Sequence, residues 1–438
     1  MSTELEHVSW RVQGPIYGAA FFYGPLQTMA SMCAALFVAG LISVELPFLI
    51  AFILASRQIL TVLLSVHSGA LMDRFGGRKA SIGFGAIAIV TAMIYPFIPG
   101  LFGLQWGTAA AGTPVALFIT ALLLVQMAAG YAEGNTWVGS QALVSQALKG
   151  HPSYAGRMIF TARLGGVLGP LLLGPAWDLW GSFGGFAVLA FWIAAGTGAT
   201  VFIPRRLEAA GPADPIAGEA EATQKGHPPI ETARRDKGPG LADSLKLLLL
   251  PAVALVMMLT VLRQAGSGIH TSFYVVWLDK EIGLSGTLIG GLMSTANVAS
   301  ALAAILTGAL ARRFPHHWLL IATIGMTILG TAIVPLLGDV YVLLMMAISI
   351  RGVGQGLNLP MMITMLAQNV PVGLQGRVTA LRVAFNRGGG ALVPLAAGAM
   401  AEVVGIAGSF YIVGAVGGIL LVILSIWVAR SDEFGRNR

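Results

Sequence analysis

Seven ionisable residues lie inside long apolar stretches of this sequence, where a charge is unfavourable. They are Arg57, Glu133, Arg163, Arg263, Arg351, Arg382 and Arg387. A charge at the centre of a bilayer costs about 2.5–3.5 kcal/mol on insertion scales, so each such residue requires a partner or a function. Six cations face one anion, and this imbalance indicates chemistry with a negatively charged partner.

Three of these arginines lie deep in their stretches and suit the binding of an anion. Arg57, Arg263 and Arg351 are central, and a guanidinium in low-dielectric surroundings binds a carboxylate or phosphate through paired hydrogen bonds. We predict that they contact a substrate, together with three polar residues in the apolar stretches, Asn358, Gln264 and Tyr131. The alternative for each residue is a fixed partner inside the protein and no contact with substrate.

Glu133 is the single carboxylate that lies away from the ends of the apolar stretches, and it suits proton transfer. A carboxylate removed from water favours its protonated form, so we predict that Glu133 carries a proton. The alternative is that Glu133 only neutralises one arginine. Arg163, Arg382 and Arg387 lie nearer the ends of their stretches, where long side chains reach the membrane interface, and we expect structural roles for them.

These residues belong to a chain that is too apolar for a soluble protein. Charged residues make up 10% of its 438 positions and hydrophobic residues 56%, whereas soluble proteins carry roughly 25% charged residues. This composition excludes a soluble enzyme, a nucleic-acid-binding protein and a disordered chain. Because a helical span needs about 20 apolar residues, the sequence predicts an all-α membrane protein with twelve transmembrane helices.

The expected spans form two groups of six. They cover 15–40, 47–70, 80–99, 114–142, 157–178, 183–203, 248–277, 285–311, 318–337, 340–367, 378–402 and 408–430. The polar segment between the groups is rich in Pro, Ala, Gly and charge and cannot bury an apolar face, which is typical of a flexible linker. We therefore predict an N-terminal six-helix bundle over 1–203, a cytoplasmic linker over 204–247 and a C-terminal six-helix bundle over 248–438.

The basic residues predict the orientation of the spans. With the amino terminus in the cytoplasm, 19 of the 26 Lys and Arg residues fall in cytoplasmic segments, and Lys280 alone falls on the outer side. Cytoplasmic loops carry the excess of Lys and Arg in membrane proteins. We therefore expect a multi-pass protein of the inner (plasma) membrane with both termini in the cytoplasm, and no signal peptide is visible.

No cofactor and no metal site is expected. Cys33 is the single cysteine, and no His, Asp or Glu residues stand at metal-ligand spacing. His67 and His270 are isolated near span ends, and we expect them to be solvated or satisfied by neighbours. The sequence has no Gly-x-x-x-x-Gly-Lys-Ser/Thr motif, which argues against ATP as the energy source.

The two halves resemble each other in sequence. GALMDRFGGRKA, which begins at Gly69, corresponds to GALARRFPHHWL, which begins at Gly308. RLGGVLGP from Arg163 corresponds to RGGGALVP from Arg387, with Arg, Gly and Pro repeated at one offset of 224. Repeated six-span halves with a site at their interface are typical of secondary transporters.

The first of these motifs resembles the signature loop of the major facilitator superfamily, Gly-x-Leu-x-Asp-Arg-x-Gly-Arg-Arg/Lys. The matching residues are Gly69, Asp73, Arg74, Gly76, Arg78 and Lys79. One extra Gly precedes Arg78. The resemblance implies that this loop is a conformational latch. In the second copy, Arg312 and Pro315 stand in place of Asp73 and Gly76, so a latch there would be degraded.

A second motif resembles the span-five antiporter motif of the same superfamily. It consists of Gly165, Gly169, Pro170 and Gly174. Leu173 stands where the family usually has Gly. The resemblance implies an exporter, and the alternative is ordinary close packing of helices through small residues.

Together the motifs imply the major facilitator fold, two pseudo-symmetric six-helix bundles. The resemblance also implies that spans one, four, seven and ten line a central cavity, which places Glu133, Arg263 and Arg351 on cavity helices. The implied activity is secondary active transport by alternating access. One hypothesis is proton-coupled antiport, or efflux, of a small molecule; the other is import or exchange of an organic anion through the midplane arginines.

The expected partners are a small-molecule substrate, protons and the lipid bilayer, with no nucleic acid, and the chain is expected to act as a monomer. An enzyme is not expected, because no nucleophile with a base and no paired metal ligands occur at membrane depth. A receptor is not expected either, because the longest polar segment, 204–247, is short for a soluble domain.

Overall fold

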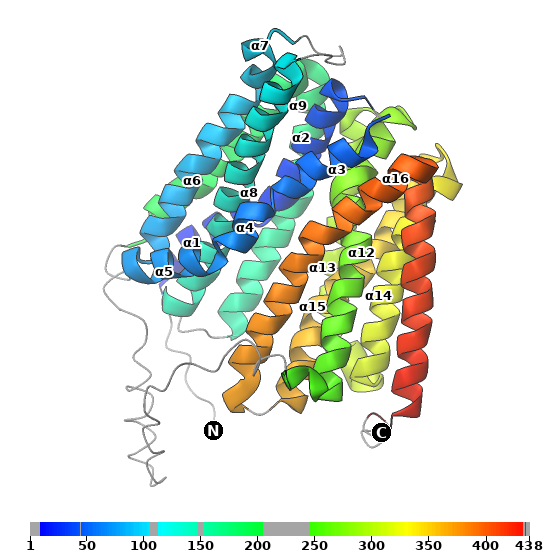
Figure 1. Ribbon diagram of the computed structural model, residues 1–438. Coiled ribbons are helices and arrows are strands. Elements are labelled where there is room, and N and C mark those ends of the chain that lie inside the picture. Colours follow the sequence, from blue (N-terminus) through cyan, green and yellow to red (C-terminus); the bar gives the residue numbers. More distant parts are fainter. Residues whose placement is uncertain are drawn as a thin grey trace.

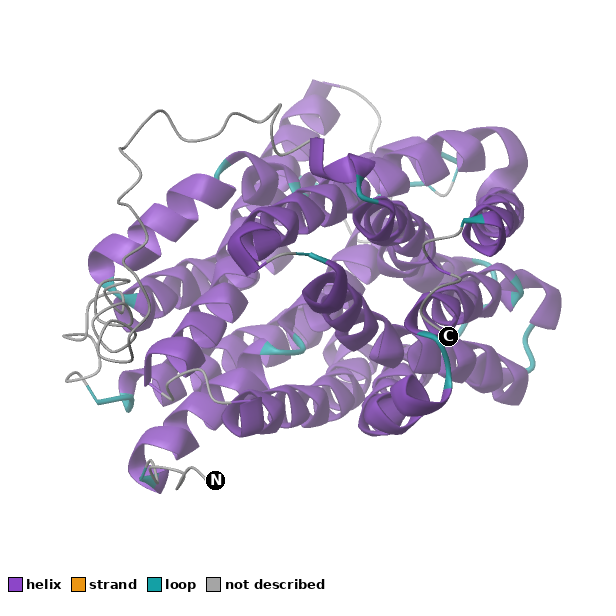
Figure 2. Ribbon diagram, turned by 90° about the horizontal axis from the view of Figure 1, so that it is seen from below, coloured by secondary structure: helices purple, strands orange, loops and turns teal. Residues whose placement is uncertain are grey.

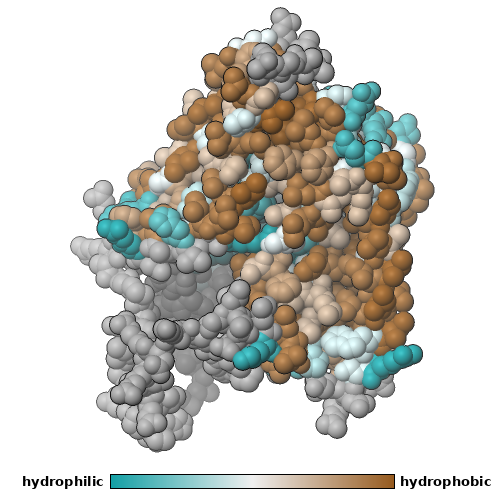
Figure 3. Space-filling view, in the orientation of Figure 1, coloured by the Kyte–Doolittle hydropathy of each residue, from teal (hydrophilic) through white to brown (hydrophobic). Residues whose placement is uncertain are grey.

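The protein is built from helices that are long and apolar enough to cross a membrane. The computed structural model describes residues 9–43, 45–104, 113–147, 152–204, 246–370, 372–431 and 434. Within these ranges no strand occurs (Figure 2). Hydrophobic residues cover most of the face shown in Figure 3, and hydrophilic residues gather toward its two ends. The predicted all-α, multi-pass membrane protein is confirmed.

The first half runs from α1 to α9 (Figure 1). Its helices are α1 Trp10–Tyr23, α2 Leu26–Leu41, α3 Pro47–Ser56, α4 Ile59–Leu63, α5 Ser65–Phe75, α6 Gly77–Ile94, the 3-10 turn η1 Tyr95–Phe97, α7 Ile98–Leu101, α8 Thr113–Ala147 and α9 Pro152–Val201. Pro25, which has no N–H to donate, separates α1 from α2. Span two is broken after Ser56, whose hydroxyl donates to the carbonyl of Ile53 at 2.6 Å.

The second half repeats this arrangement. Its elements are the 3-10 turn η3 Lys246–Leu249, α12 Pro251–Lys280, α13 Gly286–Arg313, α14 His316–Ala332, the 3-10 turn η4 Val334–Leu337, α15 Tyr341–Asn369 and α16 Val372–Arg430. Residues 205–245 lie outside the described part of the chain. The linker over 204–247 and the division into two domains therefore remain predictions.

Two of the long helices each contain two spans. Gly181 (φ 58°) divides α9 and Gly405 (φ 77°) divides α16, a backbone region that glycine enters without steric cost. Eight stretches are long and apolar enough to span a bilayer. Counting α9 and α16 twice, and adding the broken second span and the 17-residue α14, accounts for the twelve expected spans.

The two halves meet mainly along three helix pairs, α9 with α13, α3 with α16, and α2 with α12. Smaller contacts join α3 to α12 and α4 to α16. We call the end of the molecule at which α3 and α13 begin the distal end, and the end at which α1 begins and α16 finishes the proximal end (Figure 1). The contacts of α3 and α13 with the opposite half begin at the distal end, where Phe48 meets Glu402 and Gly286 meets Asp178.

Candidate functional site

A buried ion pair lies in the first half, where span two breaks. The Nη2 of Arg57 donates to the Oε2 of Glu133 on α8. Its Nη1 donates to the Oε1 of Gln126 at 3.0 Å, and the hydroxyl of Tyr95 donates to the same oxygen at 2.7 Å. Arg57 is 7% exposed and Glu133 is 5% exposed. The two residues that the sequence analysis assigned to substrate and proton are therefore neighbours, and each neutralises the other.

The close approach of α8 to the break in span two depends on Gly130. A Cβ at this position would overlap the backbone of Arg57, with the Arg57 Cα and carbonyl carbon at 2.8 Å. Gly134, one turn further along α8, has space, because its nearest neighbour would be the Thr61 Cγ2 at 3.6 Å.

We expect Gly130→Ala to lower the stability of the protein by about 1–3 kcal/mol, because overpacking forces the backbone of Arg57 away from α8. Gly134→Ala is the matched control and should not lower stability, since alanine favours a helix more than glycine does. The thermal unfolding midpoint of the purified protein in detergent measures both effects. Equal midpoints for the two variants would contradict the packing argument.

A small polar pocket between the halves borders the ion pair. It has a volume of about 30 Å³ and is lined by Gln27, Ser31, Leu54, Ala55, Arg57, Gln58, Thr271, Ser272, Gly390 and Pro394. These residues come from α2, α3 and the break after it, α12 and α16, so both halves contribute. The pocket has room for about one water molecule. Arg57 therefore contacts Glu133 within its own half and also lines the space between the halves.

The interior arginines of the second half have no carboxylate partner among the residues that the structure describes. Arg263 donates through Nη2 to the Oδ1 of Asn386 on α16, and Gln264 donates to the Asn386 carbonyl at 3.0 Å. Arg351 is 2% exposed, donates through Nη1 to the Oε1 of Gln355 at 3.2 Å, and has no partner for Nε. Arg263 interacts electrostatically with Arg351 and with Arg382. This half of the interior is therefore positively charged.

Two residues of α12, His270 and Tyr274, lie within electrostatic range of Arg351. The sequence alone did not assign them to a site. The rings of His270 and Tyr274 stack with centroids 4.9 Å apart, and both residues interact electrostatically with Arg351. The Nδ1 of His270 and the hydroxyl of Tyr274 are buried and have no hydrogen-bond partner in the structure. His270 and Tyr274 are four residues apart on one helix, so they share a face. This spacing is the feature of the sequence that could have grouped them.

Two predicted substrate residues, Asn358 and Tyr131, do not line the polar pocket, and their contact with substrate stays a prediction. Asn358 accepts a hydrogen bond from the Thr323 hydroxyl at 2.6 Å and donates to the Thr327 hydroxyl at 3.5 Å, so it joins α15 to α14. Tyr131 packs edge-on against Phe84 of α6. Each residue lies in the predicted span, but the rotation of the helix turns its side chain toward a neighbour within its own half.

The comparisons with known proteins agree with this architecture. The family model described as Major Facilitator Superfamily matches residues 256–437. This second part of the chain therefore resembles the major facilitator superfamily. No curated protein sequence matches the chain significantly.

Solved transporters share the fold over almost the whole chain. The xylose transporter XylE from E. coli, partially occluded and inward open, is 13% identical, with 96% of this chain and 97% of that chain covered and a TM-score of 0.64. The nucleoside transporter NupG is 13% identical over 95% of this chain and 98% of that chain, with a TM-score of 0.64. A bacterial homologue of the iron transporter ferroportin, inward facing, is 17% identical over 96% and 100%, with a TM-score of 0.65. These similarities establish the fold and do not select a cargo.

The loop that resembles the superfamily's signature connects α5 to α6. Gly76 has φ 82° and lies between the two helices. Arg78 donates to the carbonyl of Val201 at 2.8 Å, which joins the loop to the end of α9, whereas Arg74 is exposed. Gly69 and Asp73 lie in α5, and their side-chain environment is outside the described part, so the latch role of the loop stays a prediction.

The glycines of the span-five motif pack α9 against three other helices. A Cβ at Gly165 would meet the carbonyl of Phe21, one at Gly169 would meet Met29, and one at Gly174 would meet the carbonyl of Gly286. Gly286 belongs to the second half, so this motif shapes the interface between the halves. The motif therefore packs helices closely, which is the alternative role that its small residues predicted.

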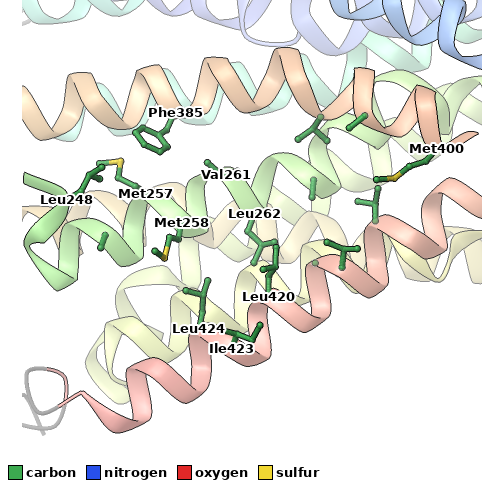
Figure 4. Close-up of a pocket in the computed structure, with 17 residues that line it drawn as sticks. Leu248, Met257, Met258, Val261, Leu262, Phe385, Met400, Leu420, Ile423 and Leu424 are labelled. Carbon is green, nitrogen blue, oxygen red and sulfur yellow. The ribbon is translucent and has the colours of Figure 1, made fainter. Parts of the chain in front are cut away.

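A larger pocket between α12 and α16 is apolar. It measures about 660 Å³ and is lined by 17 residues that are aliphatic, methionine, phenylalanine or glycine, among them Met257, Met258, Phe385 and Leu420 (Figure 4). It contains no group that could orient a charge. The polar pocket at Arg57, although it has room for only about one water molecule, contains the kind of charged group that this apolar pocket lacks.

Proposed function

We propose that this chain is a proton-coupled secondary transporter of a small organic anion. The observation that carries the proposal is the balance of interior charge. Arg57 is neutralised by Glu133, whereas Arg263 and Arg351 have no carboxylate partner among the described residues. A buried guanidinium without a counter-charge is a favourable place for a carboxylate or phosphate. The cargo would supply the negative charge that this half of the protein lacks.

The ion pair at the polar pocket supports coupling to protons. An anion that enters the pocket competes with Glu133 for Arg57, which lines that pocket. A buried carboxylate that loses its cation is unfavourable as a charge, so Glu133 would take up a proton. Because coupling between two binding events is reciprocal, anion and proton favour each other's binding. This arrangement supports their movement in the same direction.

Export by proton antiport is the second candidate function. The observation in its favour is the motif of Gly165, Gly169, Pro170 and Gly174, which resembles that of exporters and lies at the interface between α9 and α13. In both cases we place the protein in the inner (plasma) membrane with both termini in the cytoplasm. We also propose that it acts as a monomer, because one chain supplies both sides of the polar pocket.

Uptake into proteoliposomes tests this function. Radiolabelled mono-, di- and tricarboxylates and phosphate esters are offered with and without an acidic outside, while a trapped dye reports the internal pH. One pH unit is worth about 1.4 kcal/mol, so a coupled monoanion should accumulate about tenfold per unit and its entry should acidify the lumen.

A lumen that becomes alkaline during cargo entry would identify antiport in place of cotransport. Transport of a cation or a neutral compound, with no movement of any anion in the panel, would refute the anionic cargo.

A further inference from the structure

Two carboxylates join the halves at the distal end, one from each half. Asp178 of α9 accepts hydrogen bonds from the backbone N–H of Gly286 at 2.7 Å and of Thr287 at 2.8 Å, and from the Thr287 hydroxyl at 2.6 Å. Glu402 of α16 accepts a hydrogen bond from the backbone N–H of Phe48 at 3.0 Å. Each carboxylate therefore caps the first turn of a helix that belongs to the other half.

The first turns of α3 and α13 both need such a partner. The first N–H groups of a helix have no acceptor within that helix, and they carry a partial positive charge that favours an anion. In α13 the side chain of Ser285 accepts from Leu288 at 3.4 Å, and Asp178 serves the two preceding N–H groups. In α3 the first residue is Pro47, which has no N–H, so Phe48 provides the first donor.

The internal repeat relates the two caps to each other. Asp178 and Glu402 are 224 positions apart, the offset that also separates Arg163 from Arg387. Phe48 and Thr287 are 239 positions apart, the offset between Gly69 and Gly308 at the start of the other repeated motif. The same contact is therefore made twice, once in each direction across the interface.

A glycine accompanies each carboxylate one helical turn earlier. Gly174 precedes Asp178 by four residues and Gly398 precedes Glu402 by four, so glycine and acid share a face of their helix. A Cβ at Gly174 would overlap the backbone of Gly286, and a Cβ at Gly398 would overlap the side chain of Ala51. Each unit combines a close helix contact with a cap on the partner helix.

We propose that Asp178 and Glu402 form a paired distal gate, which holds while the distal end is closed and is released at both sites when the halves rotate to open it. Opening of this end must separate α9 from α13 and α3 from α16, the two helix pairs that carry the caps. The uncapped N–H groups then bind water. The gate thus sets the balance between distal-closed and distal-open states, whatever the cargo or coupling ion.

Distances between spin labels on the two halves test the gate in the absence of cargo. Leu101→Cys on α7 and Leu336→Cys in η4 provide exposed distal sites, 76% and 71% exposed, in a Cys33→Ala background. We expect the double variant Asp178→Asn, Glu402→Gln to raise the ratio of long to short distances at least about tenfold, because bonds to a charged acceptor are the strong ones. Each single variant should give a smaller shift.

The matched control is Asp279→Asn, a distal carboxylate that pairs with Lys280 of its own helix at 3.2 Å and should leave the distances unchanged. If the double variant does not fold, Thr287→Val removes one donor and should shift the ratio in the same direction. Equal distance distributions for the gate variants and the control would overturn the proposal. A shift for one carboxylate and none for the other would overturn the pairing.

Discussion

Glu133→Leu is expected to lower the stability of the protein by about 3–5 kcal/mol, because Arg57 would remain as a buried charge without a counter-ion. The other neighbours of Arg57 compensate little for the lost negative charge. Gln126 accepts a hydrogen bond from Arg57 but carries no charge, and the same oxygen also accepts from Tyr95. Thermal unfolding in detergent measures the loss, with Glu45→Leu, an exposed carboxylate at the distal end, as the control.

The double variant Arg57→Met, Glu133→Leu separates structure from transport. Replacing both members of a buried ion pair by apolar groups is often neutral or stabilising, so the double variant should recover most of the lost stability. It should still fail to accumulate anions against a pH gradient in proteoliposomes, because the groups that bind cargo and proton are absent. Retained gradient-driven accumulation would show that the pair has only a structural role.

Gln355→Glu is expected to raise the KM for the anion at least about 30-fold without lowering the unfolding midpoint. The Oε1 of Gln355 lies 3.2 Å from the Nη1 of Arg351, so a carboxylate there would give Arg351 a permanent internal partner. Loss of a buried charged contact costs about 2 kcal/mol or more in binding, and each 1.4 kcal/mol is a factor of ten.

Further variants distinguish an Arg351 that binds the anion from an Arg351 that is only a buried structural residue. Arg351→Gln should lose binding to a similar extent, while Gln141→Glu makes the same chemical change at an exposed position of α8 and should leave KM unchanged. KM is measured from initial uptake rates, with the unfolding midpoint recorded for each variant. An unchanged KM for Gln355→Glu would mean that Arg351 does not contact the anion.

The fold could be predicted because the features that determine it, long apolar stretches separated by polar or glycine-containing turns, can be identified along the sequence. Each expected span coincides with a helix or a broken helix to within a few residues, as in the predicted 285–311 against α13 Gly286–Arg313. The hairpins at Gly181 and Gly405 fall within the gaps left between the expected spans. The break after Ser56 was not predicted, and it lies where α8 packs closely on the backbone of Arg57 through Gly130, a contact between distant parts of the chain.

The candidate site could be predicted only in part. Sequence reasoning selected Arg57, Glu133, Arg263 and Arg351 because charge in apolar surroundings is rare and costly. It did not pair Arg57 with Glu133, which are 76 positions apart. It did not foresee that Asn358 bonds to hydroxyls of α14, and it left His270 and Tyr274 outside the site.

The sequence by itself indicated the apolar spans, the internal repeat and the small set of interior charges, since hydrophobic burial and the cost of buried charge depend on composition and spacing along one helix. The tertiary structure decided which arginine is neutralised, which polar residues reach the pocket and which carboxylates cap helices of the other half. Successive residues of a helix point about 100° apart, so a modest rotation about its axis exchanges one partner for another. That rotation is set by close packing between helices from distant parts of the chain, as at Gly130 against Arg57 and Gly174 against Gly286.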